Sequence, residues 1–350
     1  MTSVPDGVAS ARTEREDLSA SRYPVVDAGG SLSDAVAAAE PDARVVATQR
    51  LAKRVHRVIL TRGTRSSLVV KRLSRVTARK TTLLNSRWLP AVGLQDRGPP
   101  LLANAPGPEQ SAWQVFEDLG DCALRPDRRD LGGAEAATHL VAQLHVAFVG
   151  HSLLPECIET LADLGARSYG DWVRRAARAL ETIETRSLSP GRLALRDRLS
   201  RRLDALLAEE PGRRQRLQQA GGPMALLHGD LWPQNVLLPE APDGRRARLI
   251  DWDHAGVGPI SYDLSTFISR FPLRARIRVL RLYERVVRSA GWRLSDPASL
   301  NDAFETAEYA RLASCLIWPA EAVRGGADWA FKDLEAVDGW FAELRPVLRQ

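Results

Sequence analysis

Apolar and polar residues alternate along three short runs near the start of the chain. These runs are ARVVATQ (43–49), VHRVILT (55–61) and SSLVVKRL (66–73). Alternation with a period of two is typical of half-buried β-strands. A fourth run, SAWQVFEDLG (111–120), indicates a buried strand that ends in an acidic turn. Helical spacing is confined to 31–40 and 76–88 in this part, so the N-terminal third is predicted to be mainly strand.

Beyond residue 120 the apolar positions follow a helical spacing instead. Residues 132–151 place their apolar side chains on one face and predict an amphipathic helix. Further helices are expected over 158–186, 190–220, 261–291 and 299–348. Short apolar segments at 225–230, 235–240 and 246–251 interrupt this pattern and indicate strands around loops. The pattern predicts a small strand-rich part followed by a large helical part.

Composition limits the class of protein. Apolar residues make up 44% of the 350, which is enough for a sizeable core. We find no apolar stretch of about 18 residues and no apolar segment near the N-terminus, so neither a membrane span nor a secretory signal is expected. The three cysteines are far apart and read as free thiols. A cytoplasmic protein without a membrane partner is therefore expected.

Net charge is unevenly distributed along the chain. The total is +6, and residues 1–112 hold 17 Lys and Arg against 10 Asp and Glu. An excess of this kind attracts anions such as nucleotide phosphates. No basic stripe with interleaved aromatic residues accompanies it, so a nucleic-acid partner is not expected.

Two polar motifs in the second half point to chemistry. HGDLWPQNVLL (228–238) and IDWDHAG (250–256) each follow an apolar run. Asp230 and Asn235 have the Asp-x-x-x-x-Asn spacing of kinase catalytic loops, and Asp251 occupies the place of a metal-binding Asp after a strand. Phosphoryl transfer needs one carboxylate to orient the attacking hydroxyl, and oxygen ligands to hold Mg²⁺ against the nucleotide phosphates.

The two motifs, HGDLWPQNVL and LIDWDHAGVGPISYDLS, resemble those of the aminoglycoside phosphotransferase and choline kinase group of small-molecule kinases. The resemblance implies that Asp230 is the catalytic base and that Asn235 and Asp251 bind Mg²⁺. It also implies supporting roles. His228 braces the loop, Asp253 joins the metal shell or lies just outside it, and Asp263 ties the catalytic loop down through backbone donors.

The resemblance further implies an α+β, protein-kinase-like bilobal fold, with a small β-rich N-lobe and a large, mainly α-helical C-lobe. The expected division is a flexible tail (1–30), an N-lobe (31–115), a hinge (116–121) and a C-lobe (122–350). ATP, or GTP, and Mg²⁺ are the expected cofactors.

Lysine is rare in this chain, which makes one position stand out. There are four Lys against 45 Arg, and Lys71 lies inside the apolar run 66–73. Kinases of this type place a strand Lys against the α- and β-phosphates. The predicted nucleotide-binding residues are Lys71, Arg50 and, through the hinge backbone, Glu117, Asp118 and Leu119.

The sequence departs from the kinase pattern at two points. The phosphate-covering turn within 48–57 contains no glycine, so Arg50 and its basic neighbours are expected to supply charge there. No acidic residue lies between Arg72 and Gln95, where the strand Lys usually finds a Glu, and Ser86 falls at that place. The partner of Lys71 is then Asp118, Asp251 or phosphate alone.

These observations lead to one main hypothesis and two alternatives. The main hypothesis is a kinase that phosphorylates a hydroxyl of a small molecule, namely an aminoglycoside or other antibiotic, a sugar or amino sugar, or an amino alcohol. The departures motivate a nucleotide-binding pseudokinase as the alternative, and a metal-dependent phosphatase ranks last because it normally wants two metals with His ligands. The sequence makes no prediction of oligomeric state.

Several residues keep two interpretations each. Trp232, close after Asp230, flanks the substrate or packs, and His145 is expected to pack rather than to do chemistry. An acidic set at helical spacing is a solvated face or, if it faces the acceptor, favours a cationic substrate. That set is Asp302, Glu305 and Glu308.

Overall fold

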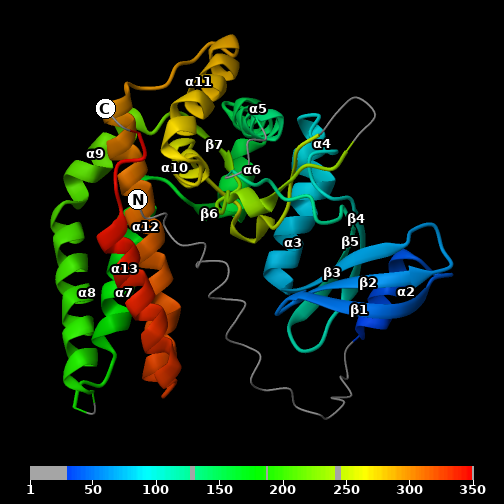
Figure 1. Cartoon of the computed structure of the whole chain (residues 1–350), viewed down its shortest axis with the longest axis horizontal. Helices are drawn as coiled ribbons and strands as arrows, with labels where there is room; N and C mark the ends of the chain where they lie inside the picture. Colours follow the sequence, from blue (N-terminus) through cyan, green and yellow to red (C-terminus); the bar gives the residue numbers. More distant parts are fainter. Residues whose placement is uncertain (1–29, 127–130, 187, 241–245, 349–350) are drawn as a thin grey trace. The chain divides into compact units, whose positions relative to one another are not determined.

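A computed structural model of the chain describes residues 30–126, 131–186, 188–240 and 246–348 (Figure 1). The tail predicted over 1–30 therefore lies outside the described residues except for Gly30. The chain forms two compact units. The first extends to Cys122 and includes Leu237–Asp253, and the second contains Ala123–Val236 and His254–Gln350.

The first unit is built on a five-stranded antiparallel sheet with the order β1-β2-β3-β5-β4. Its strands are β1 (Arg44–Ala52), β2 (Val55–Thr61), β3 (Ser67–Ser74), β4 (Leu101–Pro106) and β5 (Ser111–Glu117). Each strand that the alternating pattern predicts is present within a few residues of its expected ends. Valine and leucine side chains of β2, β3 and β5 form the core of this unit.

Helix α2 (Leu32–Ala39) packs on this core. Ser31 caps it, because its hydroxyl accepts the N–H of Asp34 while the Asp34 carboxylate accepts the N–H of Ser31. The apolar face of the helix buries Ala35 and Val36 against the sheet. The short helix expected over 31–40 is confirmed.

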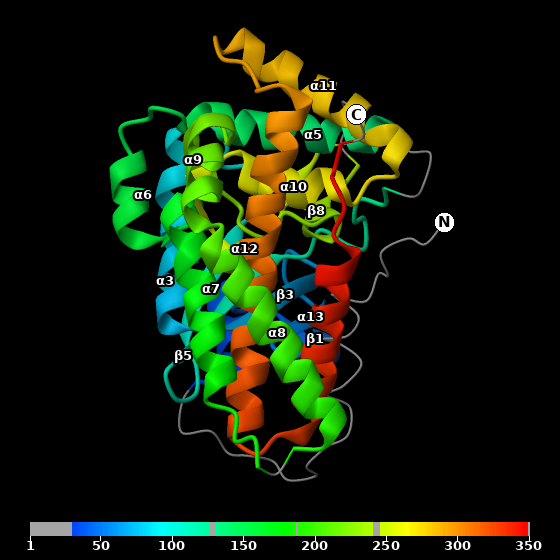
Figure 2. The ribbon, with the colours of Figure 1, turned by 90° about the vertical axis from the view of Figure 1, so that its left-hand side faces the viewer.

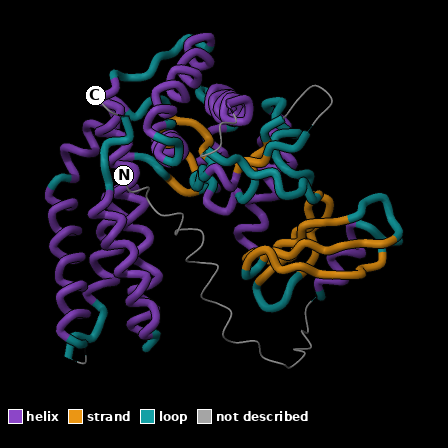
Figure 3. The backbone as a smooth tube through the Cα atoms, viewed as in Figure 1, coloured by secondary structure: helices purple, strands orange, loops and turns teal. Residues whose placement is uncertain are grey.

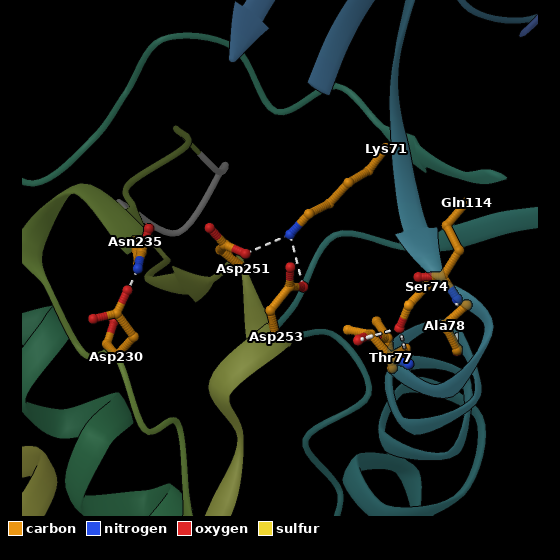
Figure 4. Close-up of polar contacts among 10 residues, drawn as sticks. Lys71, Ser74, Thr77, Ala78, Gln114, Asp230, Asn235, Asp251 and Asp253 are labelled. Atoms are coloured by element: carbon orange, nitrogen blue, oxygen red, sulfur yellow. Dashed lines mark hydrogen bonds and ion pairs between the residues drawn. The ribbon is translucent and has the colours of Figure 1, made fainter. Parts of the chain in front are cut away.

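The helical stretch expected over 76–88 is also confirmed, in three segments. These are α3 (Arg75–Leu83), a π-helical turn (Leu84–Trp88) and α4 (Leu89–Ala91). Ser74 caps α3 by accepting the N–H of Thr77, and Gln114 of β5 donates to the carbonyl of Ala78 at 2.9 Å (Figure 4). A buried side chain thereby ties the helix to the sheet.

The second unit is mainly helical, and Figure 3 shows how its helices outweigh its strands. Its helices are α5 (Leu131–Phe148), α6 (Leu154–Thr160), α7 (Ala166–Glu181), α8 (Pro190–Ala208), α9 (Glu210–Ala220), α10 (Ser261–Ser269), α11 (Leu273–Ser289), α12 (Pro297–Arg324) and α13 (Phe331–Glu343). A small sheet has the order β6-β10-β7, with strands β6 (Ala162–Asp163), β7 (Met224–Leu227) and β10 (Gly256–Pro259). A separate two-stranded sheet consists of β8 (Val236–Leu237) and β9 (Arg248–Leu249), and β9 belongs to the first unit.

Helices α7, α8, α12 and α13 run side by side in the second unit (Figure 2). Their facing sides share one apolar core, to which α8 contributes Leu199 and Leu203 and α12 contributes Leu316. None of the helices in the described ranges combines the length and the unbroken apolar run needed to cross a bilayer.

The long helices expected from the pattern are shorter than predicted. The prediction of a single helix over 158–186 was wrong near its start, because Ala162–Asp163 form a strand that pairs with β10. The one over 261–291 divides at Pro272, whose ring cannot continue a preceding helix. The stretches 190–220 and 299–348 likewise divide, at Glu209 and after Gly325.

Leu203 allows a direct test of the helical core. Its side chain is fully buried, whereas Leu193 on the same helix is 36% exposed. We expect Leu203→Ala to lower the free energy of unfolding by about 2–5 kcal/mol through lost burial and a residual cavity. Leu193→Ala is the matched control and should cost much less. Urea denaturation followed by far-UV circular dichroism measures both, and equal losses would contradict this assignment of the core.

Candidate active site

Strand β7 leads directly into the loop that carries Asp230. The loop begins with His228, which is fully buried, and Gly229. Asp263 of α10 accepts the backbone N–H of His228 at 2.7 Å and that of Gly229 at 2.9 Å. This is the arrangement that the resemblance implies for Asp263, whose carboxylate holds the loop through backbone donors.

Asp263 is fully buried, yet its surroundings favour the charged form. Burial on its own would raise the pKa of this carboxyl, but the hydrogen bond with His145 and the charges of His145 and His228 keep the pKa below its ordinary value. His145 in turn contacts the hydroxyl of Tyr283 at 2.8 Å. His145 therefore packs and bonds inside the unit, as its sequence position indicated.

The turn after His228 requires glycine at position 229. Its φ is +81°, and a Cβ at this position would lie 1.9 Å from the carbonyl oxygen of His254. Arg311 of α12 closes the turn from the other side. Its guanidinium donates to the carbonyls of Gly229 at 3.0 Å and Tyr262 at 3.1 Å. The loop that carries Asp230 is thus held by α10 and α12 together.

Asp230 and Asn235 lie in the same loop and are connected by hydrogen bonds (Figure 4). The side-chain amide of Asn235 donates to the carbonyl of Asp230 at 2.8 Å. The N–H of Trp232 donates to the same carbonyl, and the N–H of Asn235 donates to Trp232. Because the amide nitrogen of Asn235 is used inside the loop, its Oδ1 is the atom suited to a cation.

The second motif lies in the first unit, where β9 is anchored to the segment before β4. Leu249 donates its N–H to the carbonyl of Arg97 at 2.8 Å, and the Arg248 side chain donates to that of Gly98. Trp252 is buried and donates its indole N–H to Leu249. Asp251, between these fixed points, has a φ of +63°, a left-handed conformation that is uncommon outside glycine and frequent at functional sites.

Lys71 on β3 forms ion pairs with Asp251 and, at 2.7 Å, with Asp253 (Figure 4). Burial would lower the pKa of the Lys71 ammonium, but the two carboxylates raise it above its ordinary value. Of the partners that the sequence left open, Asp251 is the one present. Ser86 does not serve, since its hydroxyl donates to the carbonyl of Thr82.

The turn next to Lys71 is a tight one. Ala52 of β1 pairs with Val55 of β2, so the turn itself consists of Lys53 and Arg54. Val55 in turn pairs with Lys71 on β3. Two basic residues therefore replace the glycines of a phosphate-covering loop. Arg50, predicted to bind phosphate, lies on β1 and donates to the carbonyl of Ala52 at 3.4 Å.

The predicted hinge segment, 116–121, begins with the last two residues of β5 and lies within the first unit. Glu117 donates its N–H to the carbonyl of Pro100, and the thiol of Cys122 donates to that of Leu119. The Asp118 carboxylate is bound by the guanidinium of Arg57 at 2.7 Å, which excludes it as the partner of Lys71.

Sequence reasoning missed Arg57 and Arg311. Arg57 also pairs with Asp121 at 2.8 Å and so fixes the chain on both sides of Leu119. Its position among alternating residues of a strand was the only signal, and 45 arginines make that signal weak. Arg311 lies on a long helix among other charged residues, and nothing in the sequence distinguishes it.

The acidic set on α12 is paired and does not form an acidic face. Glu308 is buried and accepts hydrogen bonds from Ser265 and Thr266. Glu305 pairs with Arg213 at 3.2 Å, and Asp302 lies 3.7 Å from Arg216. Of the two interpretations of this set, a solvated face fits the exposed Asp302 but not the buried Glu308, and spacing along a helix does not reveal the basic partners on α9.

Asn235 and Asp251 each carry an oxygen atom of the kind that magnesium prefers. The amide oxygen of Asn235 and the carboxylate of Asp251 are hard ligands, and Mg²⁺ binds few protein groups because it keeps waters and substrate phosphates. Within the described ranges, no cluster of three or more His, Cys, Asp and Glu side chains is arranged to hold a metal.

Comparison with known proteins identifies the family. The profile of the phosphotransferase enzyme family, APH, matches residues 56–297, well over half of the chain. No curated protein sequence matches it significantly.

Solved structures share the fold at low sequence identity. The GDP and kanamycin complex of APH(2")-IIia is 15% identical, covers 89% of this chain and 99% of its own, and has a TM-score of 0.59. Plasmodium vivax ethanolamine kinase is 9% identical, with coverages of 86% and 81% and a TM-score of 0.55. Spectinomycin phosphotransferase APH(9)-Ia, in complex with ADP and spectinomycin, is 12% identical, with coverages of 87% and 90% and a TM-score of 0.53.

These likenesses confirm the predicted kinase-like α+β fold. Together with the family match, they confirm the resemblance that the two motifs carry. The chain belongs to the phosphotransferase enzyme family, the APH family of small-molecule kinases.

Proposed function

We propose that this kinase transfers the γ-phosphoryl group of ATP or GTP to a hydroxyl of a small molecule, with Asp230 as the catalytic base. The acceptor hydroxyl gives its proton to the Asp230 carboxylate while its oxygen bonds to the γ-phosphorus. The bond from that phosphorus to the bridging oxygen breaks, and the electron pair leaves with the nucleoside diphosphate. The observation that carries this proposal is the loop after β7, which Asp263 and Arg311 hold by its backbone while Asp230 stays accessible.

The other motif residues take roles on the nucleotide side. Lys71 steadies the α- and β-phosphates, and the basic turn beside it, with Arg50, adds positive charge. Asn235 and Asp251 would hold Mg²⁺, which neutralises charge on the transferring phosphates when bound. The backbone of Glu117 and Leu119 receives the base. Complexes of structural relatives with GDP and ADP support a purine nucleotide as the donor.

The ion pairs of Lys71 affect the choice between an active kinase and the pseudokinase alternative. That alternative was motivated by the absence of a Glu on the helix after β3. Lys71 instead finds Asp251 and Asp253 within its own unit, so the missing Glu does not leave its ammonium without counter-charge. This supports an active kinase.

Replacing the proposed base gives the most direct test. Asp230→Asn keeps the size of the side chain and removes its basicity, so we expect turnover to fall by about 10²- to 10⁴-fold with an unchanged circular dichroism spectrum. Nucleoside diphosphate release against a pooled panel of antibiotics, sugars and amino alcohols measures it. Asp302→Asn, at an exposed site, is the matched control. Wild-type rates in Asp230→Asn would reject the assignment.

Lys71→Met tests the nucleotide side. The variant removes an ammonium while preserving most of the side-chain volume, and we expect kcat/KM for the nucleotide to fall by about 10- to 100-fold through lost charge-assisted hydrogen bonds. Steady-state kinetics with varied nucleotide measures the change. Lys332→Met, on the exposed side of α13, should behave as wild type. An unaltered kcat/KM in Lys71→Met would show that Lys71 does not contact phosphate.

Asp263→Asn tests the support of the loop. The amide can accept only one of the two backbone N–H groups and sets an NH₂ donor against the other. We expect it to cost about 1–3 kcal/mol in the free energy of unfolding and to reduce turnover. Asp296→Asn is the control, because Asp296 caps α12 and Asn caps helices equally well. Thermal and urea denaturation measure both, and identical stabilities would argue against a supporting role.

A further inference from the structure

A cation lies directly on the aromatic ring that follows the proposed base. Arg270, at the end of α10, has its guanidinium carbon 3.4 Å from the centre of the Trp232 ring. Trp232 is bound through its N–H to the carbonyl of Asp230. All three residues belong to the second unit, and the charge of Asp230 acts on that of Arg270.

Arg270 differs from the arginines around it because its guanidinium has no hydrogen-bonding partner among the described residues. Its Nε is buried without an acceptor, and no carboxylate of the described residues forms an ion pair with it. Arg276 donates to three backbone carbonyls, and Arg311 is used by Gly229, Tyr262 and Glu308. Burial lowers the pKa of Arg270 to about 10, which leaves it cationic at neutral pH.

Two carboxylates of this unit act on the charge of Arg270, those of Glu308 and Asp230, and neither forms an ion pair with it. Glu308 accepts from Ser265 and Thr266 and lies 3.5 Å from Arg311, and Asp263 accepts from the catalytic loop. Arg270 is therefore a cation close to Asp230 whose guanidinium forms no ion pair with a described carboxylate. Such a guanidinium repels a cationic group of an acceptor placed against it and attracts an anionic one.

Stacking on Trp232 leaves the N–H groups at the edge of the Arg270 guanidinium available for hydrogen bonds. Its N–H groups lie in the guanidinium plane, so a ring against the face holds that plane in place without using the donors at its edge. A fixed guanidinium edge is suited to two parallel hydrogen bonds with a carboxylate or a phosphate.

We propose that Arg270 recognises an anionic group of the acceptor, and that the acceptor is a small hydroxyl compound bearing a carboxylate or a phosphate rather than a polycationic aminoglycoside. This inference rests on the proposed function, because it assigns the acceptor of the same Asp230. Trp232 is then a positioning residue that orients the guanidinium, and the two interpretations left open for it become one.

Matched acceptors provide the test. Glucuronate, glucose and glucosamine differ in charge on one sugar frame, and a wider panel adds hydroxy acids, sugar phosphates and kanamycin. We expect Asp230-dependent turnover to favour the anionic members. In Arg270→Gln, KM for the preferred acceptor should rise by about 10- to 100-fold with a smaller change in kcat and an unchanged KM for the nucleotide. Arg270→Lys should fall between, since an ammonium lacks the planar edge.

Arg274→Gln is the matched control, because Arg274 is exposed at the start of α11 close to Arg270 in the chain. Its kinetics should equal those of the wild type. Preference for glucosamine or kanamycin would overturn the inference. So would an equal loss with every acceptor together with a raised KM for the nucleotide, which would place Arg270 on the transferring phosphate.

A binding measurement separates this inference from the proposed function. Isothermal titration of the panel without nucleotide should show anionic members binding more tightly than their neutral and amine counterparts, with the difference lost in Arg270→Gln. If no compound gives Asp230-dependent turnover, the proposed function fails, and titration alone then decides the anion site. Equal binding of the three sugar frames, or equal binding by wild type and Arg270→Gln, would overturn the inference.

Discussion

The proposed active site depends on one buried carboxylate. Asp263 on α10 accepts the backbone N–H groups of His228 and Gly229, so the loop that carries Asp230 is fixed to a helix rather than to other loops. Burying a charge costs several kcal/mol unless hydrogen bonds compensate it. The loop supplies that compensation, with His145 on the far side. The dependence is mutual: the loop needs the carboxylate to hold its shape, and the carboxylate needs the loop to remain buried and ionised.

The first unit assembles its part of the chemistry by a different means. Lys71 lies on a strand, and Asp251 follows a short strand that is bonded to Arg97. The left-handed backbone of Asp251 costs about 1–2 kcal/mol, which the buried Trp252 beside it and the fixed strand before it offset. The Lys71 ammonium lies against two carboxylates of its own unit, so its positive charge is compensated there.

Short-range features of this chain could be predicted, and long-range ones could not. Asp230 and Asn235 could be placed together from the sequence because their contact stays within one loop. Lys71 could be singled out because lysine is rare and this one interrupts an apolar strand. The sheet followed from alternation. The helix break at 162–163 was not visible, since it comes from pairing with a strand far along the chain. The basic partners of Glu305 and Asp302 on α12 were not visible for the same reason, because they lie on α9.

Arginine explains why the site could not be completed from sequence. A guanidinium is weakly hydrated and planar, so it can be buried, donate to carbonyls at fixed angles, or stack on a ring. Arg311 and Arg276 donate to carbonyls, Arg311 also lies over the ring of Tyr262, and Arg270 lies over the ring of Trp232. Arg311 and Arg276 therefore hold the backbone in place, whereas the donors of Arg270 remain available for a ligand. What separates these roles is whether the donors are already satisfied, and only the arrangement of carbonyls and carboxylates around each guanidinium decides that.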